Sequence, residues 1–172
     1  MVDRQGVLQA AVALTLQHGT APSIAEVARA VGLTKQGVLH RFPSRAALDE
    51  AVLQSSLARV DAEMSAAGER GHAAETYLRL AAPSEEDRAA ALAMVALLRR
   101  GDPALLLEVE EAVARWQSMI AQELGDPVRA RVVRLVGDGL FAESLVSGRP
   151  PSPDLLDELV THLVLTAPGF GS

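Results

Sequence analysis

Residues 23–45, SIAEVARAVGLTKQGVLHRFPSR, decide the fold of the N-terminal part of this chain. Ser23 is a favoured N-cap, and Glu26 three residues later completes the S-x-x-E capping box that begins a helix. Apolar residues then recur at the three- and four-residue spacing of one helical face: Ile24, Val27, Ala28 and Val31. Gly32 lets the chain turn, and Thr34 caps a second, short helix. This pattern predicts a helix-turn-helix.

The second helix of the motif is expected to have one apolar and one polar face. Val38, Leu39 and Phe42 share the apolar face, and the pair Phe42-Pro43 ends the helix. The opposite face carries Gln36, Gly37, His40 and Arg41. Helix-turn-helix proteins place such a helix in the major groove of DNA. The motif therefore predicts a DNA-binding segment.

The same helix signals recur along the rest of the chain. Gly19 ends a predicted first helix, Ser44 caps a longer one whose first half belongs to the N-terminal part, and residues 68–71 break the chain. The pairs Asp102-Pro103 and Asp126-Pro127 each give a capping Asp followed by Pro at the first helical position. Outside the motif we predict helices over residues 3–18, 44–67, 72–82, 84–100, 103–124, 127–147 and 153–166.

The fold class follows from this series of helices. No stretch alternates convincingly as a strand, and Ala, Leu, Glu and Arg dominate the composition. In the helix over residues 84–100 we expect the apolar side chains to lie inside the fold, namely Leu92, Val95, Ala96 and Leu98, with Gly101 closing the helix. We predict an all-α protein of about nine helices with two domains, residues 1–50 and residues 51–172.

Composition and charge agree with a globular protein that offers one end to DNA. The 172 residues are 49% hydrophobic and include no cysteine, which excludes disulfides and thiolate metal sites. Residues 1–60 hold six basic and four acidic side chains, a balance of +2, so the rest carries −8 of the total −6. A basic head on an acidic body suits a nucleic-acid partner, although ordinary surface scatter explains the asymmetry equally well.

No apolar run is long enough to cross a membrane, and the N-terminus lacks the pattern of a signal peptide. We therefore expect a cytoplasmic protein with no membrane partner.

Three segments resemble the tetracycline-repressor-like (TetR) family of bacterial regulators in register: VLQAAVALTLQHG, SIAEVARAVGLTKQGVLHRF and PSRAAL. The resemblance covers about the first fifty residues, and Asp138-Gly139-Leu140 resembles a triplet of the family's penultimate helix. It implies a helix-turn-helix DNA-binding domain at residues 1–50 and a helical regulatory and dimerisation domain at residues 51–172. It also implies a ligand-responsive regulator, by family precedent a repressor, that acts as a homodimer on a palindromic double-stranded operator, with an unknown small-molecule effector and no cofactor.

The resemblance assigns base reading to Lys35, Gln36 and Gly37. Their chemistry agrees, because Gln pairs with adenine, Lys donates to guanine, and Gly permits close approach. The phosphate anchors expected from the family and from residue chemistry are Ser23, Thr34, His40, Arg41 and Arg45. Arg45 stands where the family usually has Lys, and Leu39-His40 replaces a usual tyrosine, which leaves open whether His40 replaces its phosphate contact.

A dimer interface is expected on the last two long helices, where apolar stripes exceed what one helix pair covers. Its candidate residues are Val132, Val136, Gly139, Leu140, Leu156, Leu159, Val160 and Leu163. Gly137 and Gly139 are expected to let the two backbones approach closely. The alternative is that these stripes pack on the chain's own body.

The effector site is implied by the family and only weakly by the residues. Bulky side chains on different helices form its candidate lining: Tyr77, Met94, Trp116, Met119 and Phe141. The alternative is that they are ordinary core residues.

An enzyme is disfavoured, because the four histidines follow no metal-binding spacing and neither a phosphate loop nor a nucleophile elbow occurs. Another alternative is a helical small-molecule-binding protein without DNA function, which a gel shift would distinguish.

Overall fold

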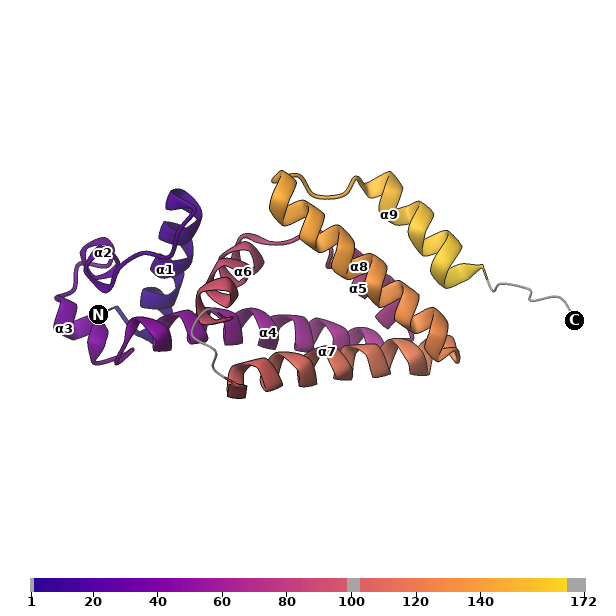
Figure 1. Cartoon of the computed structure of the whole chain (residues 1–172), viewed down its shortest axis with the longest axis horizontal. Helices are drawn as coiled ribbons and strands as arrows, with labels where there is room; N and C mark the ends of the chain where they lie inside the picture. The colour runs from indigo at the N-terminus through magenta and orange to yellow at the C-terminus, as the bar shows by residue number, and fades with distance from the viewer. Residues whose placement is uncertain (1, 99–102, 167–172) are drawn as a thin grey trace, which may run out of the picture. The chain divides into compact units, whose positions relative to one another are not determined.

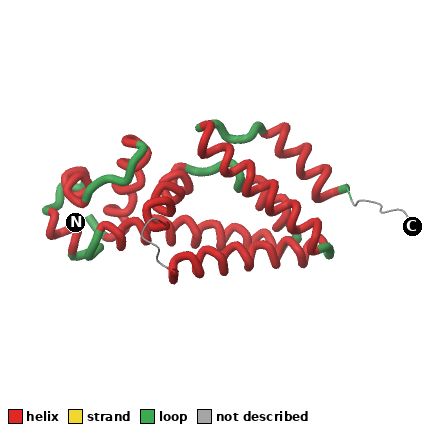
Figure 2. Tube along the Cα trace, viewed as in Figure 1, coloured by secondary structure: helices red, strands yellow, loops and turns green. Residues whose placement is uncertain are grey.

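The computed structural model describes residues 2–98 and 103–166. Within these ranges every regular element is a helix, as Figure 2 shows, and the all-α class is confirmed. The helices are α1 (Arg4–His18), α2 (Ile24–Ala30), α3 (Lys35–Leu39), α4 (Arg45–Glu69), α5 (Ala73–Arg79), α6 (Glu85–Leu98), α7 (Pro103–Leu124), α8 (Pro127–Ser147) and α9 (Pro153–Val160), followed by a π-helical turn, η1 (Thr161–Leu165). None of the described helices is both long and apolar enough to cross a membrane.

The chain forms two compact units that do not coincide with a division after residue 50. The first unit combines residues 1–58 with residues 84–106, and the second combines residues 59–83 with residues 107–172. Helix α6 joins the first unit because it packs along α1. A buried carboxylate strengthens this unit, since Asp87 of α6 accepts a 2.7 Å hydrogen bond from the Ser56 hydroxyl of α4. The first unit thus includes a helix far along the sequence.

In the first unit, α2 packs against both α1 and α3, and the start of α4 follows α3 in the same unit (Figure 1). Asp3 caps α1 through the amide of Gly6, and Gly19 ends α1 in the left-handed conformation, as the sequence predicts. The most deeply buried side chains here are Val7, Val27, Val38, Phe42 and Leu48.

The expectation that Leu92 and Val95 of α6 lie inside the fold is wrong, while the side chains of Ala96 and Leu98 lie outside the described part of the chain. Leu92 and Val95 are 38% and 57% exposed, whereas the buried positions are Ala89, Ala90, Ala93 and Leu97. Small alanines let α6 approach its neighbours closely, and helical geometry turns Leu92 and Val95 to the other side. The described part of α6 ends at Leu98, and the predicted signals at residues 99–102, including Gly101 and Asp102, lie outside the described residues.

In the second unit, α7 and α8 have the predicted bounds, and Asp126 caps α8 through the amides of Val128 and Arg129. Helix α5 packs against α8 and α9. Gly137 makes this packing possible, because a Cβ at this position would lie 2.8 Å from the Tyr77 ring. Gly137 therefore serves contact within the chain and not the close approach of two copies that was expected.

Three helix ends differ from the sequence prediction. Helix α4 continues to Glu69, so Gly68 is helical and the chain turns at Gly71, where φ is 72°. Helix α5 ends at Arg79, before the predicted stop at residue 82. The last helix widens into the π-helical turn η1, where Arg129 Nε and Nη2 donate to the carbonyls of Leu163 and Val164 at 2.7 and 2.6 Å.

Candidate nucleic-acid interface

The helix-turn-helix has the predicted local geometry. Both halves of the capping box are present, because the Ser23 hydroxyl accepts the Glu26 amide at 3.3 Å and the Glu26 carboxylate accepts the Ser23 amide at 2.7 Å. Gly32 adopts φ of 66°, which lets the Leu33 amide return to the Ala28 carbonyl at 2.9 Å. This turn sets the direction of α3.

Helix α3 presents its first turn to solvent. Thr34 caps it by accepting the Gly37 amide at 3.1 Å, while Val38 anchors it in the core. Lys35 and Gln36 are exposed, and Gly37 is half-buried. Lys35 is also the only lysine of the chain. Lys35 and Gln36 therefore offer exposed side-chain donors, and Gly37 beside them has no side chain. We call these three residues the reading edge of α3.

The structure gives the expected phosphate anchors different tasks. The Arg45 Nε and Nη2 donate to Oδ1 of buried Asp49 at 3.0 and 2.5 Å, which orients the guanidinium. Arg41 is half-buried and donates from both terminal nitrogens to backbone carbonyls. His40 is exposed at the C-terminal end of α3. Arg45 and His40 thus remain candidates for phosphate, whereas Arg41 is committed within the protein.

Ser23 caps α2, and its expected contact with phosphate stays a prediction. Hydrogen bonds from the Ser23 hydroxyl and amide hold the pKa of the exposed Glu26 carboxyl below its ordinary value. The Glu26 carboxylate therefore stands as an anion at the N-terminus of α2 at neutral pH. Ser23 acts as a helix cap.

The structure adds residues that the sequence analysis missed. Asp49 lies four residues after Arg45, so the i,i+4 spacing signals this pair in the sequence. Val2 contacts Arg41 across 39 residues, and the Arg4 guanidinium lies 4.6 Å from the centre of the Phe42 ring. These contacts between distant residues have no local sequence signal.

In the second unit, the structure brings two of the expected effector residues together. The Tyr77 and Trp116 ring centres are 6.3 Å apart, and both side chains are buried. Tyr77 donates to Asp138 at 2.5 Å, and Trp116 donates to Asp61 at 2.5 Å. Burial, and then the hydrogen bond to Asp138, raise the pKa of the Tyr77 phenol far above its ordinary value. Both aromatic residues are therefore held in a polar network.

The other expected effector residues are less closely grouped. Met119 and Phe141 are half-buried in the same unit, whereas Met94 is half-buried in the first unit. A groove of about 270 Å³ in the first unit is lined by Gln5, Leu8, Gln9, Val12, Ala13, Glu85 and Glu86. None of the expected effector residues lines this groove.

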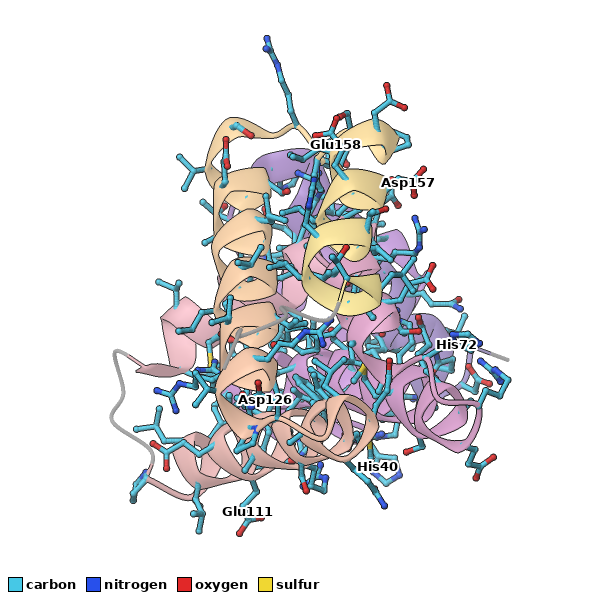
Figure 3. The ribbon with its side chains drawn as sticks, turned by 90° about the vertical axis from the view of Figure 1, so that its right-hand side faces the viewer. His40, His72, Glu111, Asp126, Asp157 and Glu158 are labelled. Atoms are coloured by element: carbon cyan, nitrogen blue, oxygen red, sulfur yellow. The ribbon has the colours of Figure 1, made fainter. Side chains whose placement is uncertain are left out.

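Helix α8 carries an exposed apolar stripe. Val128, Val132, Leu135, Gly139, Ala142 and Val146 recur at alternating spacings of four and three residues, and all six are exposed. Val136, Leu140, Leu159 and Leu163 are half-buried, while Leu156 and Val160 are each 6% exposed and belong to the chain's own core. Figure 3 places Asp126 at the start of α8, and Asp157 of α9 accepts a hydrogen bond from Arg79 of α5 at 2.9 Å.

Comparisons with known proteins identify the family. The family model described as "Bacterial regulatory proteins, tetR family" matches residues 7–52, and the model "Tetracyclin repressor-like, C-terminal domain" matches residues 71–167. Comparison with curated proteins gives no match.

Solved structures share the fold. The multidrug binding protein EbrR, complexed with imidazole, is 24% identical with a TM-score of 0.61 over 99% of this chain and 98% of its own. GusR of Salmonella enterica is 18% identical with a TM-score of 0.61, covering 95% of each chain. NalD of Pseudomonas aeruginosa, the secondary repressor of the MexAB-OprM efflux pump, is 19% identical with a TM-score of 0.53, covering 93% of this chain and 92% of its own. The chain belongs to the TetR family and is a ligand-responsive, DNA-binding transcriptional regulator, not an enzyme.

Proposed function

We propose that this regulator represses transcription as a homodimer that places α3 of each copy in the major groove of a palindromic operator. The observation that carries the proposal is the exposed first turn of α3, where Lys35 and Gln36 precede Gly37 on a helix capped by Thr34. In this arrangement Lys35 and Gln36 read base edges, and Gly37 leaves room for the DNA. Arg45, His40 and Thr34 hold phosphates. Because the operator DNA lies in the cytoplasm, we expect the protein in the cytoplasm as well.

Selection of bound fragments from random DNA tests base reading and symmetry together. We expect an inverted repeat with half-sites about one helical turn apart, centre to centre. Lys35→Ala and Gln36→Ala relax sequence preference, whereas Arg45→Ala weakens binding to all DNA and lowers the salt slope by about one. Gln122→Ala, on the exposed side of α7, is the control for Gln36→Ala. Unchanged DNA binding in the Lys35, Gln36 and Arg45 variants would exclude this interface.

The exposed stripe of α8 supports the proposed dimer. Alternating steps of four and three residues keep apolar side chains on one helical face, the pattern by which two helices pair. Gly139 and Ala142 lie in the second half of the stripe, where small side chains allow two helices to cross closely. The half-buried Val136, Leu140, Leu159 and Leu163 flank this contact, and Leu156 and Val160 support it from inside the chain.

The proposed effector is a small molecule that binds beside the Tyr77–Trp116 pair, with Met119 and Phe141 as adaptable neighbours. Met94, which belongs to the other unit, is the weakest of the five candidates. Trp116 is the only tryptophan, so its fluorescence reports ligands at this place. We expect an effector to change both this fluorescence and operator affinity, because coupling requires different affinities for the two states. A compound that changes operator affinity without changing Trp116 emission would move the effector site elsewhere.

A further inference from the structure

The side chain of Arg41 joins two backbone carbonyls that are far apart in the sequence. Its Nη1 donates to the Gly37 carbonyl at 2.7 Å, and its Nη2 donates to the Val2 carbonyl at 2.7 Å. The planar guanidinium is the one side chain that presents several donors in a fixed fork. Arg41 therefore links α3 directly to the segment that precedes α1.

The Gly37 carbonyl needs this partner because α3 ends early. The Arg41 amide donates to the Val38 carbonyl at 2.9 Å, and so does the Phe42 amide, while the His40 amide donates to the Gln36 carbonyl. The tightened turn takes the Arg41 amide away from the carbonyl four residues back. The side chain of Arg41 replaces the backbone bond that its own amide does not make.

The segment before α1 is held at a second point. Asp3 caps α1, and the Arg4 guanidinium lies over the ring of buried Phe42, in the turn that follows α3. Val2 and Arg4 thus contact Arg41 and Phe42, just after the end of α3, through two separate interactions. A five-residue helix with a central glycine has little stability of its own, so its orientation depends on such outside support.

We propose that Arg41 is a positioning residue that clamps residues 2–4 to α3 and so sets the orientation in which α3 reads DNA. The proposal rests on the proposed function of α3 and replaces the expected phosphate contact of Arg41. Both terminal nitrogens already donate to carbonyls inside the protein. Arg41 acts on operator affinity through Gly37 and Val2, without touching DNA.

Substitution of Arg41 by Lys is the first test, because Lys keeps the charge and loses the fork. Operator affinity is measured by fluorescence anisotropy over a range of salt concentrations, at a temperature at which circular dichroism shows every variant to be folded. We expect Arg41→Lys and Arg41→Met to lower operator affinity by a similar factor, about tenfold. This factor corresponds to the loss of at least one charge-assisted hydrogen bond. The salt slope stays at its wild-type value in both. Arg70→Lys, at an exposed position in the turn after α4, is the control.

A chain that begins at Asp3, released by a protease from an N-terminal tag, removes the Val2 carbonyl without changing Arg41. We expect it to lose affinity as Arg41→Lys does, and the two changes combined to lose little more. Acetylation of the new amino terminus restores a carbonyl at the Val2 position and should restore affinity. The reaction is selective near neutral pH, because an α-amino group has a pKa of about 8 and a lysine about 10.4.

The outcomes separate this proposal from the function on which it rests. Wild-type affinity in Arg41→Lys, with a lower affinity and a salt slope reduced by about one in Arg41→Met, would make Arg41 a phosphate anchor and overturn the clamp. Full additivity of Arg41→Lys and the truncation, or no rescue by acetylation, would also overturn it. Loss of the clamp leaves the effects of Lys35→Ala and Gln36→Ala intact, whereas failure of the proposed function removes those effects.

Discussion

Gly37, in the first turn of α3, has a structural task as well as its proposed functional one. The Gly37 amide donates to Thr34 and its carbonyl accepts from Arg41, so its backbone is fully used although it has no side chain. A Cβ at Gly37 would lie 3.4 Å from Thr34 Oγ1 and 3.6 Å from Leu33 Cβ, which is ordinary contact. The fold therefore accepts alanine at this position, and a glycine there costs helix stability.

Gly37→Ala separates the two tasks. We expect the variant to be more stable by about 1 kcal/mol, the difference in helix propensity, and to melt a few degrees higher. We expect operator affinity to fall about tenfold, because the new methyl group occupies the space next to the bases. Thermal unfolding and anisotropy titration measure the two effects. Higher stability with unchanged affinity would place Gly37 away from the DNA.

Tyr77 gives a pH dependence with a defined sign. Its phenol pKa is raised in the folded chain by burial and by the hydrogen bond to Asp138, relative to about 10 in the unfolded chain. The stabilisation is therefore complete below about pH 10 and is lost as the pH rises from there toward the raised pKa, because the unfolded chain releases its proton first. Tyr77 is the only tyrosine, so absorbance of the phenolate follows it directly. Tyr77→Phe should flatten the alkaline part of the stability profile, and phenolate formation near pH 10 in the folded protein would contradict the assignment.

At the scale of helices, the same kinds of residue serve as core in one place and as surface in another. On α8 the exposed stripe and the buried positions Ala130, Val133 and Gly137 lie on opposite sides of one helix. Neighbouring residues of the triplet Asp138-Gly139-Leu140 belong to different sides of α8. Asp138 accepts a hydrogen bond from Tyr77 and pairs with Arg134, whereas Gly139 belongs to the exposed stripe. Helix α8 thus holds its own unit together with one side and presents apolar surface with the other.

Leu135→Glu tests the stripe. A carboxylate in the proposed interface is desolvated in both copies, so we expect the dimer dissociation constant to rise by about thirtyfold or more. Leu107→Glu on α7 is a matched control, because Leu107 is 54% exposed and Leu135 is 52% exposed. Sedimentation velocity at micromolar concentration measures both. A wild-type monomer, or a Leu135→Glu dimer as stable as the wild type, would reject this interface.

At the scale of the whole molecule, the DNA-binding head and the dimer surface belong to different compact units. The reading edge of α3 lies in the first unit, and the exposed stripe of α8 lies in the second. Helices α4 and α7 each contribute residues to both units. DNA affinity and dimer formation are therefore separate properties of the chain that become linked only on a two-fold symmetric operator.

This linkage predicts how a monomeric variant binds DNA. We expect Leu135→Glu to bind a single half-site as the wild-type head does, and to lose the extra affinity that the wild type has for the full inverted repeat. Because a monomer neutralises half as many phosphates, its salt slope on the full operator should be about half that of the dimer. Anisotropy titrations on half-site and full operator measure this. Equal affinity of both proteins for the full operator would show that dimerisation does not contribute to recognition.

Features that depend on local chemistry could be predicted from the sequence. The all-α class, the capping box at Ser23, the caps at Thr34 and Asp126 and the bounds of α7 and α8 follow from residues within a few positions of one another, because helix ends are set by nearby donors and acceptors. The family resemblance could also be recognised from the sequence, because the helix-turn-helix is a continuous stretch of chain.

Tertiary structure alone decided what depends on distant partners. It placed α6 with the head through Asp87, turned Leu92 and Val95 outward, buried Leu156 and Val160, and committed Arg41 to the Val2 carbonyl. In each case a side chain of known type has two physically sensible uses, and only the position of a residue far along the chain selects one. Apolar periodicity indicates that a helix face is buried but not which element covers it. A basic side chain binds the acceptor that the fold brings within reach.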